Sequence, residues 1–254
     1  MIFNEFRLTG DFLHGFAILL LIFNIIKTRS CYSVSGMTTI LYVITFLCRY
    51  LDLFSFNISS IDIVLKYNTI FKIYYIVSNC LILFLIYGLF RKTIDKSHES
   101  FPIFGYLICA HILNWSTCYF TNYKNIDMEY FWRFSIYLEI LAIIPQLSLI
   151  YKQRTITKTM TYYLVMLGSY RVFYILNWIY RYNMEYYWDP ISFYCGCIQT
   201  IIYIYFFICI YPQLNNENQY QSVDLTKDII SAVDTKENIN QKSTYDIPLI
   251  HNVV

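Results

Sequence analysis

Several ionisable side chains lie inside, or at the ends of, long apolar runs of this 254-residue chain. Such groups are costly within a membrane unless they are paired or hydrated, and they usually mark a functional site. Pairing within the chain is the alternative interpretation, because Arg49 and Asp52 are three residues apart on one helical face and could neutralise each other. The full set falls on coherent helical faces, which favours a shared site. Its members are Arg7, His14, Arg49, Asp52, Glu139, Arg171 and Arg181.

Helical spacing joins these residues to aromatic side chains. Arg7 and His14 are two turns apart on one face, and Trp132 and Glu139 have the same spacing, with Glu129 one turn before Trp132. A third face forms a continuous stripe of Tyr170, Tyr174, Trp178 and Arg181. Aromatic packing between helices is the commoner interpretation of such a stripe. The arginine at its end favours a polar, aromatic cavity inside a helical bundle.

The chemistry of this cavity points to an anionic ligand. Guanidinium groups bind carboxylates through two parallel hydrogen bonds, so Arg7, Arg49 and Arg181 predict a ligand with several carboxylates. Glu129 and Trp132 could hold a ligand cation, by charge and by cation–π contact. No nucleophile–base pair, phosphate-binding loop or metal motif is apparent in the sequence, so we expect neither enzymatic activity nor a cofactor.

The elements that position these residues are predicted to be membrane helices. Hydrophobic residues make up 57% of the chain and charged residues 14%, whereas soluble domains carry about 25% charged residues. The net charge of +2 gives no indication of nucleic-acid binding. A spanning helix needs about 20 mostly apolar residues, and seven candidate runs emerge. They cover residues 12–26, 38–56, 73–90, 101–120, 134–151, 161–180 and 191–211.

The sequence therefore predicts an all-α, polytopic membrane protein with seven transmembrane helices over residues 1–212. Residues 213–254 are rich in Asn, Gln, Asp and Lys, which predicts a disordered cytosolic tail. No cleavable signal peptide is expected, because run 12–26 lacks a preceding basic segment and a small-residue cleavage site.

Loop charge predicts the orientation of the helices. Basic residues concentrate in the connections after the first, third and fifth runs, and basic loops face the cytosol. The N-terminus is then luminal and the tail cytosolic. The eight residues are Lys27, Arg29, Arg91, Lys92, Lys96, Lys152, Arg154 and Lys158.

Several segments closely resemble the KDEL receptors, a family also called ER lumen protein-retaining receptors. The matching stretches are Phe6-Arg7-Leu8-Thr9-Gly10-Asp11 with His14; Lys27-Thr28-Arg29-Ser30-Cys31; Arg49-Tyr50-Leu51-Asp52-Leu53-Phe54; Tyr67-Asn68-Thr69; Phe134-Ser135-Ile136-Tyr137-Leu138-Glu139 with Pro145-Gln146-Leu147; and Tyr170-Arg171 through Asn177-Trp178-Ile179 to Arg181-Tyr182. The resemblance covers roughly residues 1–211. It implies a fold similar to the SWEET and PQ-loop transporters, in a 3+1+3 arrangement of two three-helix repeats and a linking helix.

The resemblance also implies a function. Members of the family bind escaped ER-resident proteins in the Golgi through C-terminal Lys-Asp-Glu-Leu or His-Asp-Glu-Leu sequences and return them to the ER in coated vesicles. By this resemblance Arg49 pairs with the terminal carboxylate, Arg7 and Arg181 pair with the acidic side chains, and Glu129 and Trp132 contact the first residue. Asp52, Tyr174 and Trp178 fall on the cavity wall.

His14 matches the pH-sensing histidine of the family, with Glu139 and Tyr170 as its coupled hydrogen-bonding neighbours. Unperturbed histidine titrates near 6.5, so Golgi acidity can protonate it. The expected partners are thus the luminal tetrapeptide and, on the cytosolic side, vesicle coat or adaptor proteins. The expected location is the ER and Golgi membranes.

Two departures from the family pattern concern recycling. An acidic residue of the seventh span is replaced by Tyr205, and the usual short lysine-bearing tail is replaced by a longer segment in which acids outnumber lysines six to three. A divergent receptor that no longer recycles is therefore one alternative, and a SWEET/PQ-loop-like solute transporter is another.

Overall fold

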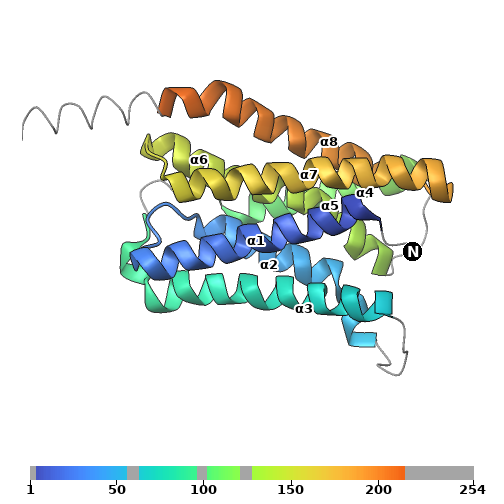
Figure 1. Ribbon diagram of the computed structural model, residues 1–254, viewed down its shortest axis with the longest axis horizontal. Helices are drawn as coiled ribbons and strands as arrows, with labels where there is room; N and C mark the ends of the chain where they lie inside the picture. Colours follow the sequence, from blue (N-terminus) through green and yellow to red (C-terminus); the bar gives the residue numbers. More distant parts are fainter. Residues whose placement is uncertain (1–3, 56–62, 96–101, 121–127, 215–254) are drawn as a thin grey trace, which may run out of the picture.

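The computed structural model describes residues 4–55, 63–95, 102–120 and 128–214, and these ranges are all helical apart from turns and short connections. The long helices run roughly side by side in one bundle, with α3 and α8 at opposite edges and α1 and α7 between them (Figure 1). Its helices are α1 (Glu5–Thr28), α2 (Gly36–Arg49), η1 (Leu51–Ser55), α3 (Ile63–Phe84), η2 (Leu85–Leu89), η3 (Arg91–Thr93), α4 (Ile103–Phe120), α5 (Met128–Ala142), α6 (Ile144–Gln153), α7 (Lys158–Glu185), α8 (Pro190–Tyr205) and η4 (Phe206–Ile210).

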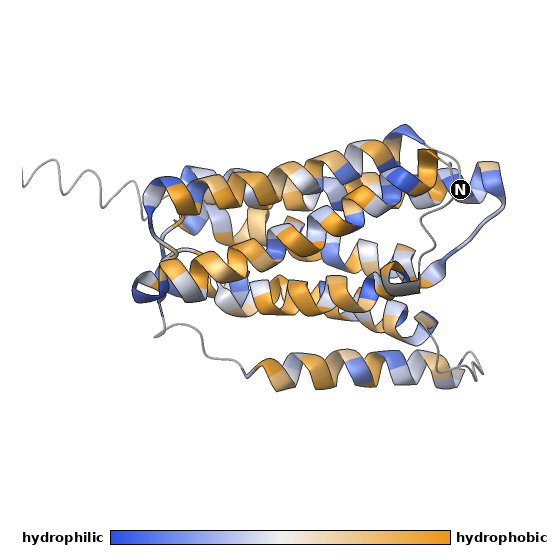
Figure 2. Ribbon diagram, turned by 90° about the horizontal axis from the view of Figure 1, so that it is seen from below, coloured by the Kyte–Doolittle hydropathy of each residue, from blue (hydrophilic) through white to orange (hydrophobic). Residues whose placement is uncertain are grey.

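Four helical segments within the described ranges are long and apolar enough to cross a membrane: Glu5–Thr28, Ile63–Leu89, Met128–Gln153 and Pro190–Leu214. Hydrophobic residues cover the bundle along its length, while hydrophilic residues gather toward the two ends (Figure 2). Large apolar side chains such as Phe12 and Phe23 remain about 60% exposed on the outside of α1. This distribution is that of a polytopic membrane protein, as the sequence predicted.

Polar side chains begin several of the helices. The Asn4 side chain accepts a hydrogen bond from the Arg7 backbone N–H at 2.8 Å, and Asn4 Nδ2 donates to Asn177 Oδ1 of α7 at 2.7 Å. Ser35 and Thr157 cap α2 and α7 in the same way. Such caps satisfy backbone donors that have no partner within the helix. The Asn4 contacts fix the start of α1, and with it Arg7, against α7.

Several helical boundaries differ from the sequence expectation: α1 and α3 begin earlier than predicted, at Glu5 and Ile63, and two other differences affect the site. The predicted run 38–56 is a regular α-helix only as far as Arg49, and the chain continues as the 3₁₀ helix η1. The fifth span starts earlier than predicted and is divided into α5 and α6 at Ile143. Pro145 lies in the first turn of α6, where its missing N–H costs no helical hydrogen bond. The predicted tail lies outside the described residues from position 215 onward.

Helix α1 packs along α7, and α2 packs against α5, which also contacts α4. The core of the bundle includes fully buried apolar residues, among them Ala17, Leu41, Leu138 and Leu164. These packings turn the faces that carry Arg7, Arg49, Glu139 and Tyr174 toward one another.

One end of the bundle is held together by glutamine side chains of α6. Gln146 Nε2 donates to the Ser33 carbonyl and Gln146 Oε1 accepts from the Ser35 N–H, both at 2.8 Å. Gln153 Nε2 donates to the Tyr32 carbonyl at 2.7 Å. We call this end, where the connection between α1 and α2 meets α6, the closed end.

Candidate functional site

A cavity of about 480 Å³ lies toward the opposite end of the bundle, among α1, α2, η1, α3, α5, α7 and α8. It reaches solvent, because the side chains of Asp52 and Glu129 on its lining are each 42% exposed. Eight of the eleven residues predicted from the sequence line it: Arg7, Arg49, Asp52, Glu129, Trp132, Glu139, Tyr174 and Trp178.

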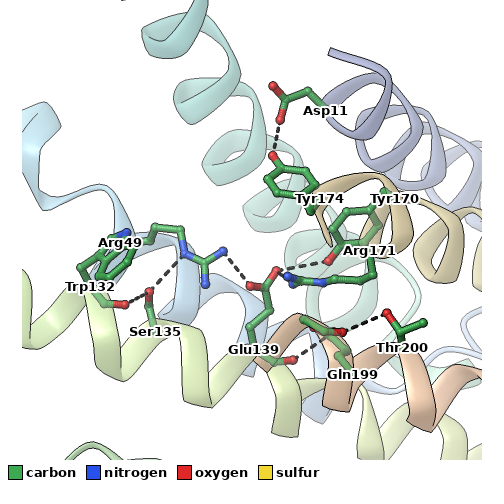
Figure 3. A network of polar contacts seen from close by, with 11 residues as sticks. Asp11, Arg49, Trp132, Ser135, Glu139, Tyr170, Arg171, Tyr174, Gln199 and Thr200 are labelled. Atoms are coloured by element: carbon green, nitrogen blue, oxygen red, sulfur yellow. Dashed lines mark hydrogen bonds and ion pairs between the residues drawn. The ribbon is translucent and has the colours of Figure 1, made fainter. Parts of the chain in front are cut away.

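Glu139 is the most buried carboxylate of the lining, with a side chain only 3% exposed. It pairs with Arg49 of α2 at 2.7 Å and with Arg171 of α7, and it accepts a hydrogen bond from the Tyr170 hydroxyl at 3.2 Å (Figure 3). Arg49 Nε also donates to Ser135 Oγ at 3.1 Å. Arg49, Glu139, Tyr170 and Arg171 form what we call the Glu139 cluster.

The contacts of the Glu139 cluster show that Arg49 and Asp52 do not neutralise each other, which was one interpretation of the sequence. Arg49 pairs across the bundle with Glu139, while Asp52 pairs with Lys72 of α3. Because α2 ends at Arg49, Asp52 belongs to η1 rather than to the next turn of the same α-helix. The spacing rule for an α-helix therefore does not apply to this pair.

A second group of contacts centres on Asp11 of α1. Its carboxylate accepts hydrogen bonds from the hydroxyls of Tyr174 and, at 2.9 Å, of Tyr67 (Figure 3 shows the first). Arg7 lies one turn earlier, with its Nε 3.7 Å from Asp11 and its Nη2 donating to Asn68 at 2.6 Å. Arg7 is thus held between α1 and α3 at the cavity edge.

His14 lies beneath the cavity rather than on its lining. Its ring is 6% exposed and is stacked between Tyr170, with centroids 4.3 Å apart, and Tyr75, at 4.6 Å. Tyr170 therefore contacts His14 with its ring and Glu139 with its hydroxyl. The contact between Tyr170 and His14 is thus a ring stack rather than the hydrogen bond that the resemblance implied, and the role of His14, Glu139 and Tyr170 in pH sensing stays a prediction.

Arg181 also lies outside the cavity lining. Its Nε donates to Glu185 Oε2 at 2.8 Å, and its guanidinium lies over the rings of Trp178 (5.2 Å to the centroid) and Tyr187 (4.2 Å). Through Trp178 it adjoins the cavity. Its Nε is therefore engaged by Glu185, and Trp178 rather than Arg181 lines the cavity with the other predicted ligand contacts.

Three more charged residues lie on or beside the cavity: Asp11, Lys72 and Arg171. Arg171 belonged to the predicted set of intramembrane charges but had no specific role, and Asp11 and Lys72 were not predicted. Asp11 had a detectable signal, since it lies four residues after Arg7 on the same face. Arg171 stood out as a charge in an apolar run, but its position beside Tyr170 did not predict which way it faces. Lys72 follows Phe71 in a mostly apolar helix, and the sequence gave no sign that its ammonium faces the cavity.

The lining carries four cations and three carboxylates, an arrangement suited to binding an anion. The cations are Arg7, Arg49, Lys72 and Arg171, and the carboxylates are Asp52, Glu129 and Glu139. Two guanidiniums share Glu139. In the described structure, buried Arg49 Nη2 has no hydrogen-bond partner. This positive excess at the most buried carboxylate is the strongest chemical feature of the cavity.

The fold and the cavity define a polytopic helical membrane protein with a cation-rich binding site. A family model described as ER lumen protein retaining receptor matches residues 30–181. The ER lumen protein-retaining receptor of Drosophila melanogaster is 40% identical over 204 residues, covering 80% of this chain and 92% of the relative. The receptor erd-2.1 of Caenorhabditis elegans is 39% identical over 219 residues, which cover 86% of this chain and 98% of the relative. The ER lumen protein-retaining receptor 3 of Mus musculus is 41% identical over 204 residues, which cover 80% of this chain and 91% of the relative.

The chain belongs to the ER lumen protein-retaining receptor family. The resemblance stated from its motifs is confirmed. This is a family of receptors and not of enzymes.

Proposed function

We propose that this protein is a sorting receptor that binds the C-terminal retrieval tetrapeptide of ER luminal proteins and returns them to the ER. The observation that supports this most directly is the Glu139 cluster, in which two buried guanidiniums share one carboxylate. The free α-carboxylate of a peptide supplies the missing negative charge and an acceptor for Arg49 Nη2. A carboxylate bound by arginine in a poorly hydrated site forms strong, charge-assisted hydrogen bonds.

The remaining ligand contacts follow from the positions of the other charges. Arg7, at the cavity edge, is suited to an acidic side chain of the tetrapeptide. Glu129 and Trp132 are suited to its first residue, by charge and by the aromatic face. Arg181 is proposed as the partner of the second acidic side chain, although it does not line the cavity in this structure.

We infer that the helices form two triads, α1–α2–α3 and α5/α6–α7–α8, joined by α4. The packing supports this, because the first helix of each triad contacts the second helix of the other: α1 packs on α7 and α5 packs on α2. Within each triad, the second helix packs on the third, as α2 does on α3 and α7 on α8. Parallel repeats of this kind place a binding site at their interface, where the cavity lies.

Local details support the same division into triads. The first span of each triad ends in an arginine with a left-handed backbone, Arg29 with φ 50° and Arg154 with φ 55°. The third span of each triad contains a π-helical turn in its C-terminal part, at Leu85–Leu89 and at Phe206–Ile210. Two unrelated helix triads would have no reason to share both features.

The cavity is proposed to open to the lumen and the closed end to face the cytosol, in ER and Golgi membranes. Seven exposed cations at and around the closed end support this orientation: Lys27, Arg29, Arg91, Lys92, Lys152, Arg154 and Lys158. Lys96 lies outside the described residues. Vesicle coat or adaptor proteins are the proposed partners of this cytosolic face.

Binding is proposed to strengthen at acidic pH through His14. The charged groups that act electrostatically on His14 are Glu139 of α5, Arg171 of α7 and Arg49 of α2. Its ring also stacks on Tyr170 of the Glu139 cluster, which is proposed to hold the peptide carboxylate. If protonation of His14 favours the peptide-binding conformation, peptide binding must favour protonation in return. One coupled proton changes affinity by up to about tenfold per pH unit.

The test is peptide binding to the purified full-length protein. A peptide ending in Lys-Asp-Glu-Leu should bind at pH 5.5, and its C-terminal amide should bind at least about 100-fold more weakly, the scale of one lost buried charge pair. Arg49→Ala should weaken the free acid strongly and the amide little. Equal affinity for acid and amide would reject the proposal. The solute-transporter alternative predicts instead uptake of a small solute into proteoliposomes that needs no peptide.

A further inference from the structure

Two carboxylates at the solvent-exposed part of the cavity are already paired with cations of the chain itself. Lys72 Nζ pairs with Asp52, and Arg133 Nη2 pairs with Glu129 at 2.6 Å. The two carboxylate side chains are each 42% exposed, whereas Lys72 is 22% and Arg133 10% exposed. The carboxylates therefore face solvent, and the two cations lie behind them.

This arrangement matters for the one positive charge of a retrieval tetrapeptide. In Lys-Asp-Glu-Leu the first side chain is the only cation, and it needs a carboxylate in the cavity. Glu139 is buried between two arginines, which leaves Asp52 and Glu129. A ligand ammonium that approaches either one must compete with the cation already present. The gain from a positive first residue is then smaller than it would be beside an unpaired carboxylate.

Lys72 and Arg133 differ in how readily each can move away from its carboxylate when a ligand cation approaches. Arg133 and Glu129 are one turn apart on α5, and Arg133 is buried. Lys72 comes from α3, reaches a carboxylate on η1 and itself lines the cavity. Its ammonium is 5.8 Å from the centroid of the Tyr50 ring. A lysine ammonium on a flexible stem that reaches its partner from another helix moves more readily than a buried guanidinium beside a partner on its own helix.

We propose that Lys72 is a specificity-determining residue: it competes with the first residue of the ligand for Asp52 and so lowers the preference for lysine over an uncharged residue at that position. This proposal rests on the proposed function, and it adds Asp52 to Glu129 and Trp132 as a contact of the first ligand residue. It names a determinant within the same cavity that lies outside the contacts to the peptide carboxylates.

The experiment compares two peptides, ending in Lys-Asp-Glu-Leu and Gln-Asp-Glu-Leu, on the purified full-length protein at one acidic pH. Lys72→Met should raise the affinity ratio of the lysine peptide over the glutamine peptide by about three- to fivefold, the scale of a partly exposed ion pair. Lys72→Arg keeps a cation beside Asp52 and should not raise this ratio. Lys66→Met is the matched control, because Lys66 lies on the same helix, is exposed and does not line the cavity.

A double-mutant cycle with Asp52→Asn tests whether Lys72 changes the peptide affinity ratio through Asp52. With Asp52 neutral, Lys72→Met should leave the ratio unchanged, and a ratio that still rises would overturn the proposal. So would a Lys72→Met variant that keeps the wild-type ratio, or one that weakens both peptides equally, since that is a structural effect. If the wild-type protein binds acid and amide peptides alike, the proposed function itself fails. Carboxylate-dependent binding with an unchanged ratio rejects only the role of Lys72.

Discussion

Replacing Glu139 by glutamine tests whether one carboxylate holds the centre of the bundle together. Glu139 is 2% exposed and is shared by Arg49 and Arg171. The neutral amide leaves both guanidiniums buried without a counter-charge. Removing one partner of a buried ion pair costs about 3–5 kcal/mol. For a domain of this size each kcal/mol lowers the melting temperature by about 2–4 °C, so we expect a fall of about 6–20 °C.

Two other variants give this prediction its controls. Arg49→Ala leaves Glu139 paired with Arg171, so its melting temperature should fall less than that of Glu139→Gln. Glu129→Gln removes a carboxylate whose side chain is 42% exposed, and exposed pairs contribute at most about 1 kcal/mol. All variants are compared in the same detergent and at one heating rate, because membrane proteins often unfold irreversibly.

The same assay connects stability with ligand binding. A peptide with a free C-terminal carboxylate restores the negative charge that Glu139→Gln has lost. A saturating free acid should therefore raise the melting temperature of this variant more than that of the wild type, and the amidated peptide should not. The reasoning is refuted if Glu139→Gln melts no lower than Glu129→Gln, or if acid and amide stabilise it equally.

Three further outcomes are expected. His14→Ala should flatten the pH dependence of peptide affinity between about 5.5 and 7.5, the window of an ordinary histidine; a variant with the full dependence would show that another group titrates. Gln146→Leu should lower the free energy of unfolding by about 1–3 kcal/mol, because the Ser33 carbonyl and Ser35 N–H lose buried partners; an unchanged melting temperature contradicts this. Truncation after Leu214 should not trap cargo-loaded receptor in the Golgi by microscopy, because the lysines beyond it are isolated among acids; trapping would show that the tail supplies the return signal.

The sequence was sufficient to predict the class of protein, and most of the site residues that it indicated line one cavity. Long apolar runs predicted membrane helices because the bilayer requires backbone hydrogen bonds to be made within each segment. Charges inside those runs predicted the cavity residues because such charges persist only where they are paired or bind something. Eight of the eleven residues chosen on these grounds, and by resemblance, line one cavity.

The sequence predicted less well where helices end. Hydropathy continues past Arg49, so run 38–56 gave no sign that α2 stops there and that Asp52 lies in a 3₁₀ helix. The predicted run 134–151 also continued across the break between α5 and α6, and Pro145 was the sequence feature nearest to that break. Element boundaries depend on caps and on tertiary contacts, which apolar periodicity does not encode.

Some ion pairs also follow from the sequence, whereas others depend on the tertiary structure. Pairs within one helix follow from spacing, and Arg133–Glu129, Arg181–Glu185 and Arg7–Asp11 are all four residues apart. Pairs between helices depend on how far each helix is rotated and displaced along its neighbour. Only the packing of α2 on α5 could bring Arg49 to Glu139, and only the position of α3 beside η1 could bring Lys72 to Asp52. Residue identity and period determined which charges face inward, and the three-dimensional contact between helices decided which of them meet.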